Sequence, residues 1–405
     1  MSQPTDPARP NLIRRTPFPD SVSRAVTTPL QPSVVYASSD PDALDDQYEG
    51  RSRGYTYGRE GHPNADVLAQ MIDRLEGGPF PIGSGGIVTG SGMSAVTATM
   101  LGLLSHGDHI VGGNQLYGRS LRMLAQDLPR WGITSSLADP TDVSALEAAI
   151  RPETKLILVE VVSNPTLRVA DMAGIEALAR ERGLILVVDN TFTTPYGYPA
   201  FEKGADVVIH SVTKLLAGHS DVTLGYVLAR DPDRRKAIYD NVVTLGLTPS
   251  PWDCWMAERG LYTFDMRFER AQANAVALAE KVADHPAVEA VIYPGRSDHP
   301  DHNRAATVLS GGFGNMLSFR LHGGRAAANA LTRAAPQLAF APTLGDVGTT
   351  LSHPASSSHR GLTPEGRLAL GITEGFFRVS VGCEPLDLLQ RDFTSALDAV
   401  VGLGD

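Results

Sequence analysis

Residues 184–221 read LILVVDNTFTTPYGYPAFEKGADVVIHSVTKLLAGHSD and contain two apolar runs, 184–188 and 207–210, that predict buried β-strands. Asp189 comes directly after the first run, and Lys214 follows soon after the second. Continuous apolar runs of this kind are typical of parallel strands that are covered on both faces. The sequence therefore predicts that a carboxylate and an amine lie at the same edge of a parallel sheet, where such folds bind ligands.

The chain on either side of this stretch alternates between strand-like and helix-like patterns. Strand-like runs occupy 86–89, 109–112, 156–160, 184–189, 207–210 and 224–229, and helical patterns occupy 65–75, 143–150 and 173–182. This alternation predicts an α/β fold with a mostly parallel sheet between two layers of helices. We assign this large domain to residues 61–255.

A change in composition near 248–251 predicts a second, smaller α+β domain over residues 256–405. One long helix is expected over 256–282, strands over 315–321, 339–344 and 376–381, and helices over 325–334 and 386–400. Residues 1–60 are rich in proline and irregular. Because 34–36 and 55–57 carry apolar and aromatic side chains, we predict an extended arm that packs on a neighbouring subunit. Residues 1–20 are equally consistent with a disordered tail.

The composition excludes several classes of protein. The 405 residues are 42% hydrophobic and 20% charged, with a net charge of −10 and no basic cluster, which argues against nucleic-acid binding. Cys254 and Cys383 are the only cysteines, so neither a disulfide framework nor a metal site is expected. There is no signal peptide and no apolar run of membrane-spanning length, which predicts a cytoplasmic protein.

Lys214 and Asp189 together form the pair that a pyridine-aldehyde cofactor requires. Such a cofactor forms a Schiff base with a lysine, and a carboxylate keeps its ring nitrogen protonated. Taken alone, a lysine after a strand is usually a surface residue, and an aspartate before asparagine is usually a turn cap. The functional interpretation depends on the other groups expected at the same edge.

Residues 89–95, TGSGMSA, follow a predicted strand and precede a predicted helix. Glycines allow the backbone to approach an anion, and the first amides of a helix point toward it. The hydroxyls of Ser211 and Thr213, which flank Lys214 in the sequence, would complete a phosphate site. The alternative is an ordinary strand-to-helix turn.

Three further residues follow or interrupt predicted strands. Tyr117 could lie flat on a cofactor ring or simply pack against the core. Asn164 precedes a proline, which favours extended backbone, so its amide would point over the sheet edge or belong to a plain turn. Arg378 lies inside an apolar strand, where its guanidinium would bind a substrate carboxylate or form a structural ion pair.

The segment 204–221, GADVVIHSVTKLLAGHSD, resembles the lysine signature of the Cys/Met-metabolism enzymes that use pyridoxal 5′-phosphate. This family includes cystathionine γ-synthase, the cystathionine lyases, methionine γ-lyase and the homoserine sulfhydrylases. Further matching segments are YTYGREGHPN (55–64), SGMSA (91–95), LYG (116–118), SNPT (163–166), VDNTF (188–192), LSHPAS (351–356) and FRVSVG (377–382). The resemblance covers nearly the whole chain after about residue 25.

The resemblance implies the fold of type I pyridoxal-phosphate transferases, with a seven-stranded sheet in the large domain. It implies that Lys214 carries the cofactor, Asp189 pairs with its ring nitrogen and Tyr117 stacks on the ring. The residues implied to hold the phosphate are Gly92, Met93, Ser211 and Thr213, with Tyr57 and Arg59 reaching the neighbouring subunit. Those implied to hold substrate or cofactor are Asn164, Thr343 and Arg378. The family also implies a homotetramer built from two dimers that share their active sites.

Several positions depart from the family pattern. Gly348 stands where the cystathionine enzymes carry glutamate, Ser357 stands where methionine is usual, and Thr343 stands where serine is common. Arg119, directly after Tyr117-Gly118, would favour a substrate with a polar or anionic distal end and is expected to contact it. These departures concern the substrate and leave the cofactor residues intact.

We expect γ-elimination from a sulfur-containing or homoserine-derived amino acid, such as methionine or cystathionine. The products would be a 2-oxo acid, ammonia and a thiol. Because of the glycine at 348, a pure cystathionine enzyme is less favoured. Three alternatives stay open: γ-replacement by a synthase or sulfhydrylase, β-elimination, and a catalytically silent relative that serves as a binding subunit.

Overall fold

The computed structural model of the protein describes residues 19, 21–78 and 80–403. The chain divides into two compact units, residues 1–30 and 31–405. Most of the first unit, and with it residues 1–18 and 20 of the predicted arm and tail, lies outside the described residues. All of the elements below belong to the second unit.

The larger sheet is mostly parallel. Its strands are β1 (Ile87–Thr89), β2 (His109–Gly113), β3 (Thr134–Ala138), β4 (Thr154–Glu160), β5 (Ile185–Asp189), β6 (Val207–His210) and β7 (Gly225–Ala229). They are ordered β1-β7-β6-β5-β4-β2-β3, and β7 alone runs antiparallel to its neighbours on both sides. The predicted seven-stranded, mostly parallel sheet is therefore confirmed.

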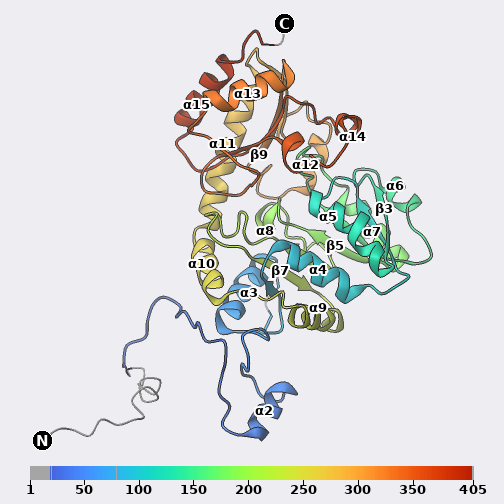
Figure 1. Cartoon of the computed structure of the whole chain (residues 1–405), viewed down its shortest axis with the longest axis vertical. Coiled ribbons are helices and arrows are strands. Elements are labelled where there is room, and N and C mark those ends of the chain that lie inside the picture. The colour runs from blue at the N-terminus through green and yellow to red at the C-terminus, as the bar shows by residue number, and fades with distance from the viewer. Residues whose placement is uncertain (1–18, 20, 79, 404–405) are drawn as a thin grey trace, which may run out of the picture. The chain divides into compact units, whose positions relative to one another are not determined.

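Helices cover both faces of this sheet (Figure 1). They are α3 (Pro63–Leu75), α4 (Gly92–Leu103), α5 (Gly118–Arg122), α6 (Val143–Ala148), α7 (Met172–Arg182), α8 (Thr194–Gly197), α9 (Pro232–Thr244) and α10 (Pro251–Leu261), with a π-helix (Met123–Asp127) and a 3₁₀ helix (Leu128–Trp131) after α5. Successive side chains of a strand point to opposite faces. Thus Val187 packs into the core beneath α4 and α9, whereas Val188 packs into the core beneath α3 and α7. This explains the continuous apolar pattern of residues 184–188.

The second sheet is smaller and mainly antiparallel. Its strands are β8 (Val288–Ile292), β9 (Met316–Leu321), β10 (Ala339–Phe340), β11 (Thr350–Ser352) and β12 (Phe376–Ser380), ordered β10-β11-β12-β9-β8. The helices of this part are α11 (Phe264–Ala283), α12 (His302–Val308), α13 (Gly324–Ala334), α14 (Pro364–Ala369) and α15 (Leu386–Asp398), with a 3₁₀ helix at Pro354–Ser356. In Figure 1, α11, α13 and α15 gather around this sheet and enclose its own apolar core.

Several predicted elements need correction. The single helix expected over 256–282 is wrong: α10 ends at Leu261 and α11 begins at Phe264, because the chain turns at Tyr262 and Thr263. The strand expected over 339–344 is limited to β10, since the loop that follows turns toward the lysine. Within the irregular region predicted before residue 60, Pro41–Tyr48 form a helix, α2, which Asp40 caps. The proposed boundaries after residues 60 and 255 stay predictions.

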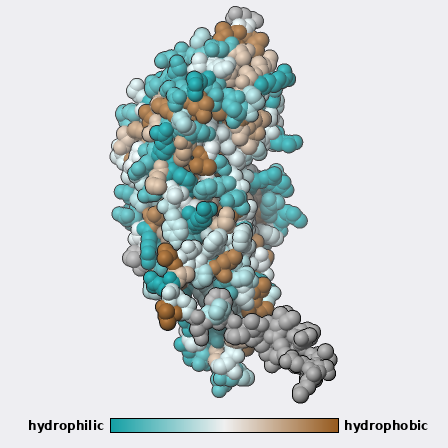
Figure 2. Space-filling view, turned by 90° about the vertical axis from the view of Figure 1, so that its left-hand side faces the viewer, coloured by the Kyte–Doolittle hydropathy of each residue, from teal (hydrophilic) through white to brown (hydrophobic). Residues whose placement is uncertain are grey.

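Within the described residues, no helix is both long enough and apolar enough to cross a membrane. Figure 2 shows polar and apolar groups intermixed over the side of the molecule that carries α10 and α11. Some large apolar side chains of these two helices and of the turn between them are well exposed, including Trp252, Tyr262 and Met266.

The core of the second sheet provides a test of this arrangement. Phe393 on α15 is only 1% exposed, whereas Leu388 on the same helix is 38% exposed. We expect Phe393→Ala to lower the free energy of unfolding by about 3–5 kcal/mol through lost burial and a residual cavity. Leu388→Ala should lower it by less than about 1 kcal/mol. Urea unfolding followed by circular dichroism measures both, and equal losses would contradict the packing of α15.

Candidate active site

Lys214 lies in the turn that follows β6, and the loop after β10 packs directly on it. The Lys214 Nζ atom donates a hydrogen bond to Thr343 Oγ1 at 3.2 Å. A Cβ atom at Gly345 would lie 2.5 Å from the Leu215 nitrogen, and the backbone of Gly345 has a φ of +85°, so glycine permits this close approach. Burial, and after it the charge of Arg378, lowers the pKa of Lys214 from its ordinary 10.5.

Asp189 is the last residue of β5, at the carboxyl edge of the sheet, and it is half-buried. Its Oδ1 atom accepts the Thr191 N–H at 3.1 Å, and Thr191 Oγ1 in turn accepts the Ser211 N–H at 2.7 Å. Burial raises the pKa of Asp189, while the contacts with Thr191 and the charge of His210 lower it. The carboxyl group thus forms no ion pair with a lysine or arginine in the described chain.

Ser91, Gly92 and Ser211 form a small cradle at the start of α4. Ser91 caps the helix by accepting the Ser94 N–H at 3.0 Å. A Cβ atom at Gly92 would lie 2.7 Å from the Ser211 Cβ, so a side chain at this position would fill the space. Met93, the next residue, places its amide in the first turn of the helix, where N–H groups attract anions.

The two hydroxyls predicted to complete the phosphate site differ in their contacts. The Ser211 hydroxyl makes no hydrogen bond within the described part of the chain. The Thr213 hydroxyl donates to the Leu224 carbonyl at 3.1 Å and accepts the Leu224 N–H at 2.9 Å. Ser211 is therefore ready to donate to an anion, whereas Thr213 would have to release its present acceptor.

Arg378 on β12 is a buried cation, only 5% exposed. Its Nη1 atom donates to Asn164 Oδ1 at 2.9 Å, its Nη2 atom donates to the Thr343 carbonyl, and its buried Nε atom has no partner. Burial lowers the pKa of this guanidinium to about 10. The structural ion pair considered from the sequence is absent from the described residues. A group this costly to bury suits a ligand carboxylate.

Tyr117 precedes α5 and is 42% exposed. Its main-chain N–H donates to Glu160 Oε1 at 2.6 Å. Arg119, two residues on, is exposed and makes no hydrogen bond or ion pair within the described chain. The sequence analysis assigned no role to Glu160. Its pattern is the same as that of Asp189, because each is an acid at the end of an apolar strand.

Tyr57 and Arg59 do not join the cluster around Lys214. They line a separate open groove of about 290 Å³, together with residues near 33–34 and 248–251. The Arg59 guanidinium lies over the Tyr57 ring at 5.2 Å from its centroid. Ser357, another departure from the family pattern, donates its hydroxyl proton to the His353 carbonyl at 2.8 Å.

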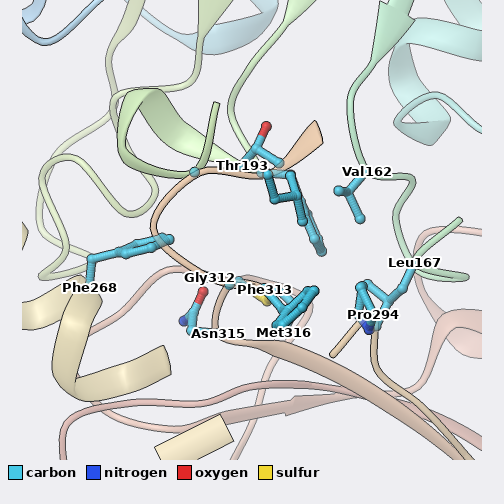
Figure 3. Close-up of a pocket in the computed structure, with 13 residues that line it drawn as sticks. Val162, Leu167, Thr193, Phe268, Pro294, Gly312, Phe313, Asn315 and Met316 are labelled. Atoms are coloured by element: carbon cyan, nitrogen blue, oxygen red, sulfur yellow. The ribbon is translucent and has the colours of Figure 1, made fainter. Parts of the chain in front are cut away.

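A second hollow lies between the two sheets (Figure 3). Its walls include Val162, Leu167, Phe268, Phe313 and Met316, and none of the predicted site residues lines it. The cavity volume of about 10 Å³ is near the lower limit for one water molecule, so it is too small for an amino acid.

The residues around Lys214 fit a pyridoxal phosphate group. They provide an amine with a lowered pKa, a carboxyl group without a cationic partner in the described residues, a cradle that a single Cβ would fill, and a guanidinium with an unused donor. No group of three or more histidine, cysteine, aspartate or glutamate side chains in the described residues is arranged to hold a metal ion.

Comparison with known proteins agrees with this chemistry. A family model described as "Cys/Met metabolism PLP-dependent enzyme" matches residues 11–398. The chain is 37% identical to cystathionine β-lyase of Bacillus subtilis (strain 168), over 94% of both chains. It is 38% identical to L-methionine γ-lyase of Pseudomonas putida, over 87% of both. The crystal structure of cystathionine γ-synthase from Xanthomonas oryzae pv. oryzae, in complex with aminoacrylate and cysteine, superposes with a TM-score of 0.87. It is 36% identical and covers 94% of this chain and 95% of that one.

The lowered pKa of Lys214 gives a test in the cofactor-free protein. Amine reagents attack only the neutral amine. We therefore expect the rate of Lys214 modification to reach half of its maximum at a midpoint below pH 10.5. Arg378→Met removes a like charge and should move this midpoint to higher pH. Peptide mapping by mass spectrometry measures the rate at each pH, with the exposed Lys236 as internal control. An unchanged midpoint in the variant would contradict the assigned coupling.

Proposed function

Since this chain belongs to the Cys/Met-metabolism family of pyridoxal-phosphate-dependent enzymes, we propose that it catalyses γ-elimination. The substrate is a sulfur-containing or homoserine-derived amino acid such as methionine or cystathionine. Reaction with one water gives a 2-oxo acid, ammonia and the expelled γ-substituent, which is a thiol from a sulfur-containing substrate and a carboxylic acid from an O-acylhomoserine. One observation carries the proposal: the Lys214 amine and the Arg378 guanidinium both bind Thr343. The guanidinium has an unused donor for the α-carboxylate of an amino acid. The amine would then lie near the α-carbon of the same amino acid.

Bound pyridoxal phosphate supplies an electron sink for negative charge at the substrate α-carbon. We assign Asp189 to the ring nitrogen, because its carboxyl group ends β5 without a cationic partner in the described chain. The amides of Gly92 and Met93 and the hydroxyl of Ser211 would hold the phosphate. Thr213 joins them in our proposal by exchanging its Leu224 acceptor for a phosphate oxygen.

Arg378 binds the substrate carboxylate through its free Nε and an adjacent Nη atom. Asn164 and Thr343 orient the guanidinium by accepting other protons of its Nη atoms. We also assign Asn164 to the cofactor ring. Lys214 removes the α-proton at Nζ, which its lowered pKa favours, because a neutral amine is the form that accepts a proton. We assign Tyr117, whose side chain is exposed, to the ring face and to the substrate amine or leaving group.

The choice of elimination over replacement rests on the departures from the family pattern. The similar proteins include a β-lyase, a γ-lyase and a γ-synthase, so similarity alone supports a family and no single reaction. Gly348 provides no side chain where the cystathionine enzymes carry glutamate, which favours a less specialised lyase. The γ-synthase likeness makes γ-replacement the second candidate.

We further propose that the enzyme is a homotetramer of two dimers with shared active sites. Two features of the surface support this. Tyr57 and Arg59 line a groove that does not include Lys214 of the same chain. In addition, α10 and α11 carry large apolar side chains that are exposed in the single chain. In the dimer, Tyr57 and Arg59 would reach the phosphate of the neighbouring subunit. The cytoplasmic location stays a prediction from the sequence.

A substrate panel tests the reaction. Methionine, cystathionine, homocysteine, cysteine and O-acylhomoserines are incubated with the enzyme and cofactor, with and without an added thiol, and 2-oxo acid and thiol release are measured. We expect 2-oxo acid from γ-substituted substrates without added thiol, and none from Lys214→Ala, which should also lose the visible absorption of the bound cofactor. Turnover only in the presence of a thiol would favour replacement, and full activity in Lys214→Ala would exclude the proposed mechanism.

Arg119 gives a test of substrate preference. Because its guanidinium is exposed and unpaired within the described chain, we expect it to bind an anionic distal group. Arg119→Ala should lower kcat/KM for cystathionine by about tenfold, the value of one charge-assisted hydrogen bond, and leave methionine nearly unchanged. Arg130→Ala, an exposed arginine farther along the chain, is the control. Equal losses for both substrates would exclude a role for Arg119 in distal recognition.

A further inference from the structure

Two neighbouring strands of the large sheet end in acids. Glu160 is the last residue of β4, Asp189 is the last residue of β5, and the two are direct partners in the parallel register. Adjacent strands lie about 4.8 Å apart, and paired residues point to the same face. The two carboxyl groups therefore leave the sheet side by side. Glu160 is the more deeply buried of the two, with 8% of its surface exposed.

The surroundings of this pair do not balance two negative charges. On the Asp189 side, Thr191 donates a hydrogen bond, and the nearby His210 on β6 acts to lower the pKa of Asp189. On the Glu160 side, the described chain provides one hydrogen bond, from the Tyr117 N–H to Oε1, and no cation within ion-pair distance. Burial, and after it the charge of Asp189, raises the pKa of Glu160 well above its ordinary value. When two carboxyl groups lie side by side in such surroundings, ionisation of one disfavours ionisation of the other.

The strand on the other side of β4 provides an independent observation. In the register of β2 with β4, Gly112 pairs with Leu158, two residues before Glu160, and Asn114 follows directly after β2, which ends at Gly113. The Asn114 Oδ1 atom is buried and accepts no hydrogen bond in the described residues. A buried acceptor of this kind calls for a donor. A neutral carboxyl group on β4 offers one, whereas a carboxylate does not.

We propose that Glu160 is a positioning residue that works as a neutral acid: it keeps the single proton of the Glu160–Asp189 pair and holds the main chain at Tyr117. Asp189 then keeps its negative charge for the ring nitrogen of the cofactor. Because Oε1 accepts the Tyr117 N–H, the same carboxyl group also sets where the tyrosine ring enters the site. The inference rests on the proposed cofactor site and is independent of which substrate the enzyme uses.

The sign of the pH dependence follows from the raised pKa. A carboxyl group that is harder to ionise in the folded protein stabilises the fold below its unfolded pKa, and this stability is lost as the pH rises through the folded pKa. The groups that contact or act on the pair are the Tyr117 N–H before α5, the Thr191 N–H after β5 and His210 on β6. Glutamine has the shape of the neutral acid and cannot ionise, so Glu160→Gln removes this loss.

The first experiment compares cofactor-free wild type, Glu160→Gln and Glu160→Ala. We expect the unfolding temperature Tm of Glu160→Gln to equal or exceed that of wild type at neutral pH. The difference between the two Tm values should grow as the pH rises. Its Kd for pyridoxal phosphate should stay within about twofold of wild type, because the amide still accepts the Tyr117 N–H. Glu160→Ala should bind the cofactor about tenfold more weakly, because that N–H loses its acceptor. Glu153→Gln, an exposed glutamate just before β4, is the control and should change neither quantity.

A tenfold weaker Kd in Glu160→Gln, or a Tm that falls below wild type with rising pH, would show that Glu160 is ionised and overturn the proposal. If Glu160→Gln does not fold, infrared spectroscopy of wild type and Asp189→Asn decides instead. A protonated carboxyl band at neutral pH in wild type supports the proposal, and its absence overturns it. If the substrate panel shows no γ-elimination, the stability and Kd measurements still test the protonation of Glu160. The two proposals can therefore be contradicted independently.

Discussion

Two cations, Lys214 and Arg378, share Thr343 as a hydrogen-bond partner, one through its hydroxyl and the other through its carbonyl. They come from different sheets, and the loop that carries Thr343 connects strands of the second sheet while packing against the lysine turn of the first. Like charges repel, and the proximity of Arg378 is one reason why the pKa of Lys214 is lowered. The packing of the two sheets around Thr343 therefore determines both where the amine lies and how readily it accepts a proton.

The polar groups at the edge of the large sheet are costly to bury without a ligand. Arg378 has an unpaired Nε atom, and Asp189 and Glu160 lie side by side with no lysine or arginine within ion-pair distance in the described residues. A buried polar group that lacks its partner costs on the order of 1–3 kcal/mol, so this arrangement lowers the stability of the chain alone. The same groups gain partners when an anionic, ring-containing cofactor and an amino acid bind. Binding of cofactor and substrate therefore satisfies groups that destabilise the chain alone, and it orients the ligands at the same time.

The sheet edge was predictable from the sequence because strand ends carry a strong local signal. An apolar run that ends at Asp189, and another that ends just before Lys214, indicate a parallel sheet and its ligand-binding edge. The glycine-rich turn before α4 was recognisable for the same reason. The break between α10 and α11 was not, because Tyr262 and Thr263 do not interrupt the helical pattern as glycine or proline would. Strand β3 was also missed, since its residues, TSSLA, lie at an edge of the sheet and lack a continuous apolar run.

The sequence by itself determined the family, the cofactor chemistry and the strand ends that carry Asp189 and Lys214, because these depend on short motifs and local periodicity. Only the tertiary structure decided which groups meet. The contacts of Thr343 with both cations and the pairing of Arg378 with Asn164 join residues far apart in the chain. The register that places Glu160 beside Asp189 is likewise a property of the assembled sheet. Distances between such residues follow from packing between elements, and no local pattern in the sequence records them.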